Sequence, residues 1–191
     1  MLQIWGLKYP LIVGGATTYS QALYDIINDY RSKGGLFIAA SGNDSANTDL
    51  NEHYPSSYNL DNIISVAATN RNDDLASFSN YGRKSVDIAA PGEEIYSTVV
   101  NGYDTYSGTS MATPHVAGVV ALIKSLDSSL NYSQIKDILY NGVDKKPHLS
   151  NKLSTGGRLN AFKAIKNITK EKKWVPIIMN DIMTFVPSVE K

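Results

Sequence analysis

The chain has 191 residues, no cysteine, and 18 basic side chains that balance 18 acidic ones. This length predicts one domain with its own hydrophobic core, and the neutral balance argues against nucleic acid or a membrane surface as a partner. The lack of cysteine excludes disulfides and thiolate zinc sites, and no apolar run is long enough to span a bilayer.

Short apolar runs alternate with amphipathic segments along the chain, a pattern typical of a mainly parallel α/β sheet with helices on both faces. Strands are expected in the segments 10–15, 36–43, 62–69 and 85–92, each bounded by Gly, Asn, Asp or Pro. Helical spacing of apolar residues predicts helices within the segments 19–35, 111–126, 131–142 and 157–168. The last stretch, 174–191, fits an edge strand or a docking segment.

Ser110 lies in the stretch SGTSMATPHVAG, at the start of the helix expected over 111–126. Free N–H groups and the macrodipole stabilise negative charge at a helix N-terminus, which suits a nucleophile whose reaction forms an oxyanion. A serine at this place is also a common N-cap. Position alone does not separate these two interpretations.

Asn43 follows directly after the predicted strand and glycine of FIAASGN. Ligands of open α/β sheets bind beyond the carboxyl ends of the strands, and an amide there can aim two N–H donors into that crevice. An Asn-Asp pair after glycine is by itself only a turn signal. Asn43 and Ser110, however, both follow predicted strands at the same sheet edge, so they fit an oxyanion donor and a nucleophile.

Five segments of the chain occur in the order typical of one protease family: AASGND, HYPSSYNLDNIISVAAT, LASFSNYG, DIAAPGEEIYST and GTSMATPHVAG. With them the chain resembles the C-terminal half of the subtilisin-like serine proteases, peptidase family S8, from about Tyr19 to Ile168. The resemblance implies a three-layer α/β/α fold with a mainly parallel sheet, truncated on its N-terminal side.

The resemblance also implies roles for individual residues. Ser110 matches the nucleophile, Asn43 the oxyanion donor, and Thr109 the residue that supports that donor. The resemblance implies a pocket for a substrate side chain. One wall is formed by Ala40, Ser41 and Gly42, and the other by the glycines Gly14 and Gly15. Tyr54 and Pro55, joined by a cis peptide bond, lie at its base. His115 matches a structural helix residue, and no residue of this sequence is assigned as a metal ligand.

The catalytic aspartate and histidine of the family are missing from this sequence. The family carries them upstream in D-S-G or D-T-G and in H-G-T motifs, and neither motif occurs here. The three histidines, His53, His115 and His148, are not followed by Gly-Thr. In subtilisin itself, loss of the base lowers turnover by about 10⁶. The chain alone is therefore expected to be almost inactive, with the upstream half of the domain needed for activity.

The N-terminal segment departs from the family pattern, which has S-W-G-G before the helix of residues 19–35. A suitable choice of codons for residues 3–15, shifted by one base, can be read as a sequence ending in S-W-G-G. We interpret residues 1–13 as a frameshift product, residues 14–168 as the C-terminal part of the catalytic domain, and residues 169–191 as a linker and C-terminal extension.

Two functions stay open from the sequence: a serine endopeptidase that works through an acyl-enzyme on Ser110, and a non-catalytic remnant with at most weak peptide binding. A dinucleotide site at LIVGGATT lacks G-x-G-x-x-G, and Ala112 stands where a lipase elbow needs glycine. The resemblance implies a peptide or protein substrate, no required cofactor, a structural calcium ion, and a secreted or cell-surface location, although the chain shows no signal peptide.

Overall fold

The computed structural model describes the whole chain except residues 1–10, 13, 172–173, 180–181 and 188–191. Its main sheet has the strand order β1-β2-β3-β4-β8-β7, and every neighbouring pair is parallel except β8 with β7. The expected mainly parallel sheet is therefore confirmed. The strands are β1 Leu11–Ile12, β2 Phe37–Ala40, β3 Ile63–Thr69, β4 Ile88–Pro91, β7 Asp144–Lys145 and β8 Gly157–Arg158.

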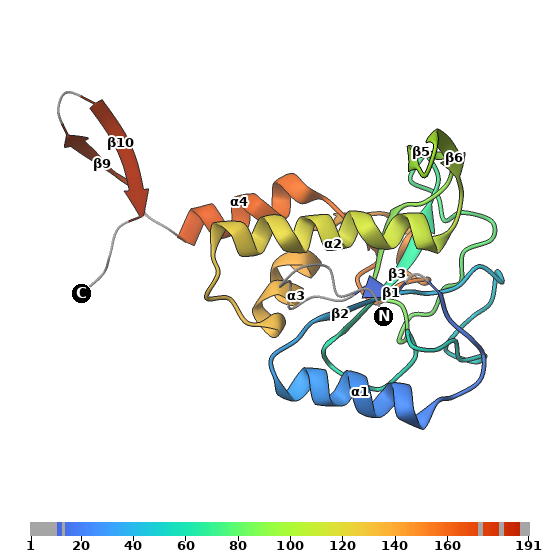
Figure 1. Cartoon of the computed structure of the whole chain (residues 1–191). Helices are drawn as coiled ribbons and strands as arrows, with labels where there is room; N and C mark the ends of the chain where they lie inside the picture. Colours follow the sequence, from blue (N-terminus) through green and yellow to red (C-terminus); the bar gives the residue numbers. More distant parts are fainter. Residues whose placement is uncertain (1–10, 13, 172–173, 180–181, 188–191) are drawn as a thin grey trace.

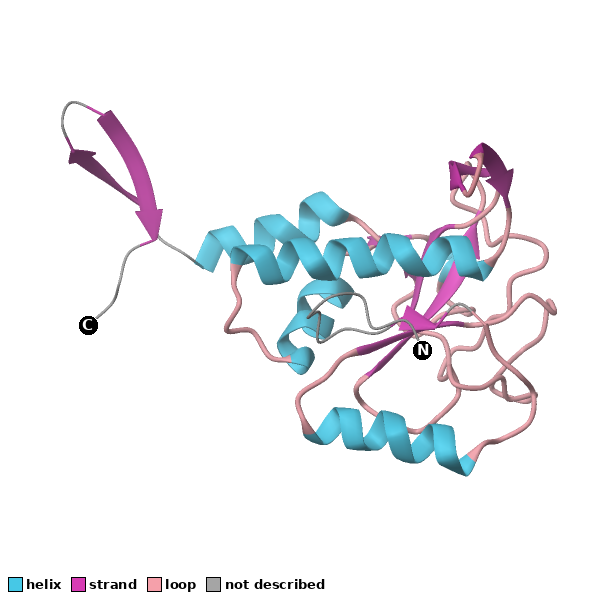
Figure 2. Ribbon diagram, in the orientation of Figure 1, coloured by secondary structure: helices cyan, strands magenta, loops and turns pink. Residues whose placement is uncertain are grey.

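Helices cover both faces of this sheet (Figures 1 and 2). Helix α1 and the short 3-10 turn η1 lie on one face, and three helices lie on the other. The three layers match the predicted α/β/α architecture. The elements are α1 Gln21–Ser32 and η1 Pro147–Leu149 on the first face, and α2 Thr109–Leu126, α3 Tyr132–Asn141 and α4 Ala161–Glu171 on the second.

The central strands are apolar because they are covered from both sides. All seven residues of β3 and all four of β2 are buried, and a strand enclosed on both faces has no polar alternation. On the face of α2, Ile38, Val66 and Ile88 pack into one core cluster with side chains of α2, α3 and α4. On the opposite face, Ile27 of α1 packs on Phe37. These two clusters fix the positions of the strand ends.

Helix starts show how local hydrogen bonding sets the element boundaries. In α3 the Asn131 side chain accepts from the backbone of Gln134 while the Gln134 side chain accepts from the backbone of Asn131, which forms a capping box. Helix α2 begins at Thr109 with Gly108 as its N-cap. Ser110 is the second residue of the helix, so the interpretation of Ser110 as an N-cap is wrong.

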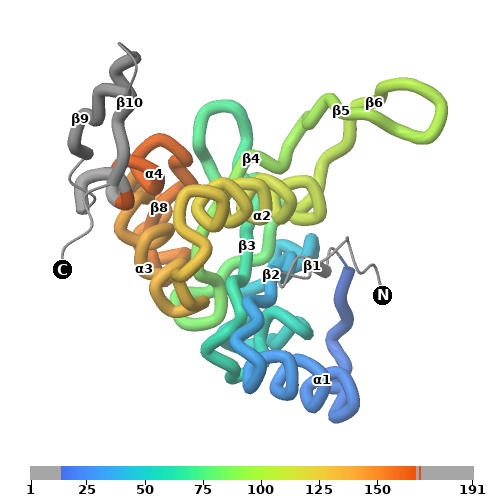
Figure 3. The backbone as a smooth tube through the Cα atoms, turned by 60° about the vertical axis from the view of Figure 1, so that its left-hand side comes forward, coloured from blue at the N-terminus to red at the C-terminus, as the bar shows by residue number. Residues whose placement is uncertain are grey.

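Two hairpins lie outside the main sheet. Strands β5 (Ile95–Val99) and β6 (Gly102–Tyr106) form an antiparallel pair that the sequence reading did not predict, and Figure 3 shows this pair projecting from the body. Residues 174–187 were expected as an edge strand or docking segment. They form β9 (Trp174–Met179) and β10 (Ile182–Pro187), a separate antiparallel pair.

The N-terminal segment is described only in part. Residues 1–10 and 13 of the proposed frameshift product lie outside the described residues, whereas Leu11–Ile12 form β1 and pair in parallel with β2.

Candidate active site

The start of α2 is anchored at the carboxyl end of the sheet. The backbone N–H of Gly108 donates to the carbonyl oxygen of Gly92, directly after β4, over 2.7 Å. On the following turns, Val116 and Val120 are fully buried against the sheet. The position of Ser110 at the helix start therefore follows from core packing and from one bond to the neighbouring strand end.

Asn43 reaches this helix start from the end of β2. Its side-chain oxygen accepts two hydrogen bonds from Thr109, one from the backbone N–H over 2.8 Å and one from the hydroxyl over 2.9 Å. The Thr109 hydroxyl in turn accepts from the backbone N–H of Gly42 over 3.3 Å. Because the amide oxygen of Asn43 is held by these two donors, its NH₂ group faces away from Thr109.

The side-chain nitrogen of Asn43 and the backbone nitrogen of Ser110 both border the space beside Gly108. A Cβ atom on Gly108 would lie 3.5 Å from Asn43 Nδ2 and 3.6 Å from Ser110 N. The backbone of Gly108, at φ 161° and ψ 160°, is extended and open to any residue, and a Cβ atom there would occupy this space at ordinary contact distances. Gly108 is not among the site residues predicted from the sequence, although a glycine directly before a predicted helix could have indicated it.

Two of the remaining predicted site residues, Gly15 and Gly42, lie against one buried side chain, that of His53. Gly15 and Gly42 lie on opposite sides of its ring. Tyr54 pairs with Ala16 through two backbone hydrogen bonds, from Ala16 N over 2.9 Å and to Ala16 O over 2.7 Å. The Tyr54–Pro55 peptide bond is cis, as predicted. Of the others, Ala40 ends β2, Ser41 is buried beside it, and Gly14 is exposed with no neighbour within 4 Å of an added Cβ.

The imidazole of His53 is enclosed. Its side chain is buried, at 8% exposure, and among the described residues no partner lies within hydrogen-bonding distance of Nδ1. Burial lowers the pKa of His53, and the charge of Asp44 opposes that shift. His53 is not among the site residues predicted from the sequence, because it lacks the family's H-G-T context. Its place directly before Tyr54 and Pro55, two predicted pocket residues, could have indicated it.

Tyr54 belongs to an aromatic cluster. The Tyr54 hydroxyl donates to Glu52 over 2.5 Å, and this hydrogen bond, with burial, raises the pKa of Tyr54 to about 12. Its ring meets those of Tyr58 and Tyr19 at centroid distances of 4.7 and 5.2 Å. These contacts hold the loop that carries His53 and Tyr54.

The other two histidines have backbone partners elsewhere. His115 Nδ1 lies 2.9 Å from the carbonyl oxygen of Met111, within α2. His148 Nε2 lies 3.0 Å from the carbonyl oxygen of Asp73.

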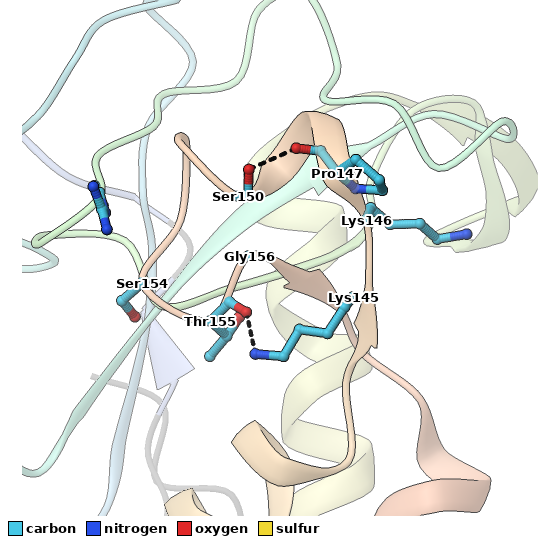
Figure 4. Close-up of a pocket in the computed structure, with 8 residues that line it drawn as sticks. Lys145, Lys146, Pro147, Ser150, Ser154, Thr155 and Gly156 are labelled. Atoms are coloured by element: carbon cyan, nitrogen blue, oxygen red, sulfur yellow. Dashed lines mark hydrogen bonds between the residues drawn. The ribbon is translucent and has the colours of Figure 1, made fainter.

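A separate cavity of about 400 Å³ lies between the β7–η1 segment and the loop before β8 (Figure 4). Most of the basic and hydroxyl side chains that line it have partners within the chain. Lys145 Nζ donates to Thr155 O, Ser150 Oγ donates to Pro147 O, and Lys146 is paired with Asp73 over 2.6 Å. None of the predicted site residues lines this cavity.

Among the residues that the structure describes, no three His, Asp or Glu side chains come together in a way that could hold a metal ion. Within the same residues, no helix combines the length and apolar character needed to cross a membrane.

Comparisons with known proteins identify the class to which this fold and this helix start belong. Residues 10–159 match the subtilase family of peptidases. The chain is 43% identical over 162 residues to thermitase of Thermoactinomyces vulgaris, covering 84% of this chain and 55% of thermitase. It is 50% identical over 95 residues to subtilisin-like protease 2 of Plasmodium falciparum, covering 49% of this chain and 7% of that protein.

A solved structure agrees with these sequence relatives. The prenylagaramide maturation protease PagA superposes with a TM-score of 0.74 and 28% identity, covering 86% of this chain and 63% of that one. The chain therefore belongs to the subtilase family, whose members are serine proteases. It spans little more than half the length of thermitase and a smaller share of subtilisin-like protease 2.

Proposed function

We propose that this chain is the nucleophile-bearing part of a serine endopeptidase, with Ser110 as the nucleophile and Asn43 as an oxyanion donor. The observation that carries this proposal is the convergence of Asn43 Nδ2 and Ser110 N on the space beside Gly108. An acyl-transfer oxyanion needs N–H donors gathered at one place, and these two nitrogen atoms flank the same space. Family membership supports the same reaction.

In the proposed reaction the Ser110 hydroxyl oxygen attacks the carbonyl carbon of a peptide bond, and a histidine imidazole takes the hydroxyl proton. The carbonyl oxygen gains the negative charge and accepts from Asn43 Nδ2 and Ser110 N. Collapse of this intermediate breaks the C–N bond, and the leaving amine takes the proton from the imidazolium. Water then hydrolyses the acyl-enzyme by the same steps, which regenerates the Ser110 hydroxyl.

The histidine in this scheme comes from outside the chain. His53 is enclosed, while His115 and His148 bind backbone carbonyls, and the H-G-T and D-S-G motifs are absent from the sequence. We propose that an upstream segment supplies the aspartate and histidine and packs on the outward side of α2. There, Gly118 and Leu122 are exposed, the latter at 48%.

The remaining assignments rest on the family resemblance. Residues 14–168 would form the C-terminal part of the catalytic domain, preceded by the frameshift product of residues 1–13, and residues 169–191 would be a linker and extension. The pocket of Gly14, Gly15, Ala40–Gly42, Tyr54 and Pro55 would hold a substrate side chain, with Thr109 supporting Asn43. The substrate would be a peptide or protein, and the enzyme would act outside the cell or at its surface.

A non-catalytic remnant is the second candidate, favoured by the missing histidine and aspartate motifs. Peptide cleavage separates the two. The chain alone should cleave no peptide above a Ser110→Ala control, whereas the chain preceded by an Asp- and His-bearing segment of a subtilase should cleave, and Ser110→Ala in that assembled protein should abolish cleavage. A folded assembled protein without Ser110-dependent cleavage would favour the remnant.

A further inference from the structure

The cavity beside the β7–η1 segment (Figure 4) has charged side chains of one sign only. Among the described residues, its charged lining side chains are Arg83, Lys145 and Lys146, and no carboxylate lines it. The rest of the lining consists of three hydroxyl side chains, a proline and a glycine, which are Ser150, Ser154, Thr155, Pro147 and Gly156. Its volume of about 400 Å³ falls in the range of small-molecule sites, about 300–1,000 Å³. Size and charge together suit a small anion.

The guanidinium of Arg83 is open to a ligand. In the part of the chain that the structure describes, no hydrogen bond or ion pair joins it to another residue, and Arg83 is exposed. The backbone is fixed on both sides of it, because Gly82 N donates to Lys152 O over 2.8 Å and Lys84 N donates to Asp49 Oδ1 over 3.0 Å. Arginine has five N–H donors in a planar fork that fits phosphate and carboxylate groups. Arg83 therefore has donors that a bound anion can use.

Lys145 is held at the cavity by one hydrogen bond. Its Nζ atom donates to Thr155 O over 2.5 Å, and Figure 4 shows the side chain reaching across to Thr155. An ammonium group has three N–H donors, so two remain. Lys146 runs in the opposite direction in the same view, and its charge is matched by Asp73 over 2.6 Å. Arg83 and Lys145 are therefore the two cations that a ligand can use.

Two carboxylates outside the lining have partners of their own. Asp73 pairs with Arg158 over 2.6 Å as well as with Lys146. The Asp87 carboxylate accepts from the backbone N–H of Ser65 over 2.8 Å. Neither carboxylate lines the cavity, so the two open cations have no acidic counterpart within the lining.

The cavity lies at the opposite end of β4 from the proposed reaction centre. Ser154 N donates to Val86 O over 2.8 Å, shortly before β4 begins. The helix start that carries Ser110 is bonded to Gly92, directly after β4 ends. A ligand in this cavity would therefore leave the proposed reaction centre free.

We propose that this cavity binds a phosphate group, either the free anion or the ester of a small molecule, with Arg83 and Lys145 as its two cationic partners. A phosphate ester carries a charge of about −1.5 to −2 at pH 7, which matches two cations better than the single charge of a carboxylate does. The fork of Arg83 can donate to two phosphate oxygens, and Lys145 can donate to a third. The site goes beyond the proposed function, because no step of peptide cleavage uses it.

Titration of the full chain with glycerol phosphate, followed by NMR, tests this site. Amide shifts should saturate at millimolar concentration and centre on Arg83 and residues 145–156. Arg83→Ala and Lys145→Ala should each weaken binding by about 10-fold or more, as expected for a lost hydrogen bond to a charged group. Lys84→Ala is the matched control, because it removes the same charge from a neighbour outside the lining, and it should bind as the parent does. Ser110→Ala should also bind as the parent does.

Two more probes identify the part of the ligand that binds. Inorganic phosphate and glycerol phosphate should shift the same amides, and the tighter of the two tells whether the site takes the free anion or an ester. Acetate should bind more weakly than either, because it carries one charge. Acetate that binds as tightly as the phosphate compounds would overturn the assignment to phosphate.

The proposal fails if the folded chain shows no saturable shift with either phosphate compound. It also fails if Lys84→Ala weakens binding as much as Arg83→Ala, since the effect would then be general to positive charge on this surface. If Lys145→Ala does not fold, as judged by thermal unfolding, the exposed Arg83 still decides the matter through Arg83→Ala. All of these readouts are binding measurements, so they stand apart from the cleavage assays that test the proposed function.

Discussion

The start of helix α2 and its outward side differ in how many contacts this chain provides for them. At the start of the helix, Asn43, Thr109 and Gly42 are joined by hydrogen bonds within the chain. Along its outward side, Gly118 and Leu122 lie open. The contrast is what the proposed function expects, with the oxyanion donors in this chain and with the catalytic base and the cover for α2 supplied by another segment.

The largest expected effect is on the free energy of unfolding, which should differ between substitutions on the inner and outer sides of α2. Ile123 is fully buried, while its neighbour Leu122 is 48% exposed. Ile123→Ala should lower the free energy of unfolding by about 2–5 kcal/mol, because it leaves a cavity in the core. Leu122→Ala should change that free energy by less than about 0.5 kcal/mol. Urea unfolding of both variants measures this, and equal losses would contradict the contrast.

Removal of one oxyanion donor should affect the reaction and spare the fold. Asn43→Ala in the assembled protein should lower the cleavage rate by about 10²–10³-fold, the loss measured for this donor in subtilisin itself. Asn47→Ala is a matched control, because Asn47 Oδ1 accepts only in a local turn with Asp49 N. Similar rates for the two variants would mean that Asn43 supports no oxyanion.

A methyl group at Gly108 should block the space between the two donors. Since the backbone there is extended, Gly108→Ala should fold with little change in its thermal midpoint. Displacement of the substrate carbonyl by even about 1 Å should lower the cleavage rate by up to roughly 10²-fold. Cleavage at the parent rate would place the oxyanion elsewhere.

The smallest expected effect concerns pH. The folded-state pKa of His53 is lowered by burial, so the unfolded chain binds the proton more readily. The contribution of His53 to the free energy of unfolding should be fully present above the ordinary histidine pKa of about 6.5. It should be lost as the pH falls from there through the lowered pKa of the folded state, by at most about 1.4 kcal/mol per pH unit. Urea midpoints from pH 7.5 to 5 should show this slope in the parent and not in His53→Gln.

Much of the fold follows from sequence patterns because the central strands are enclosed. Segments such as 62–69 are continuous apolar runs ended by turn residues, and the structure places β3 at Ile63–Thr69. The helix start was less predictable: α2 begins at Thr109 because Gly108 is tied to Gly92, a contact between distant residues. The β5–β6 hairpin was missed since its residues are largely exposed and carry no core pattern.

The residues of the candidate site that lie in short motifs could be predicted from the sequence, whereas the spaces between backbone segments could not. Asn43 and Ser110 could be named from FIAASGN and GTSMA. The volume beside Gly108 and the gap filled by His53 depend on backbone segments far apart in the sequence, such as Gly15 and Gly42. Neither can be derived from periodicity or turn signals.

The central claim is that Ser110 has its oxyanion donors within this chain and its base outside it. Mass spectrometry of Ser110 after exposure to a fluorophosphonate tests this most directly. The chain alone should be labelled no faster than its Ser110→Ala control, and addition of an Asp- and His-bearing segment should give rapid labelling that Asn43→Ala slows. Rapid Ser110 labelling of the chain alone, or labelling of the assembled protein that is indifferent to Asn43, would contradict the claim.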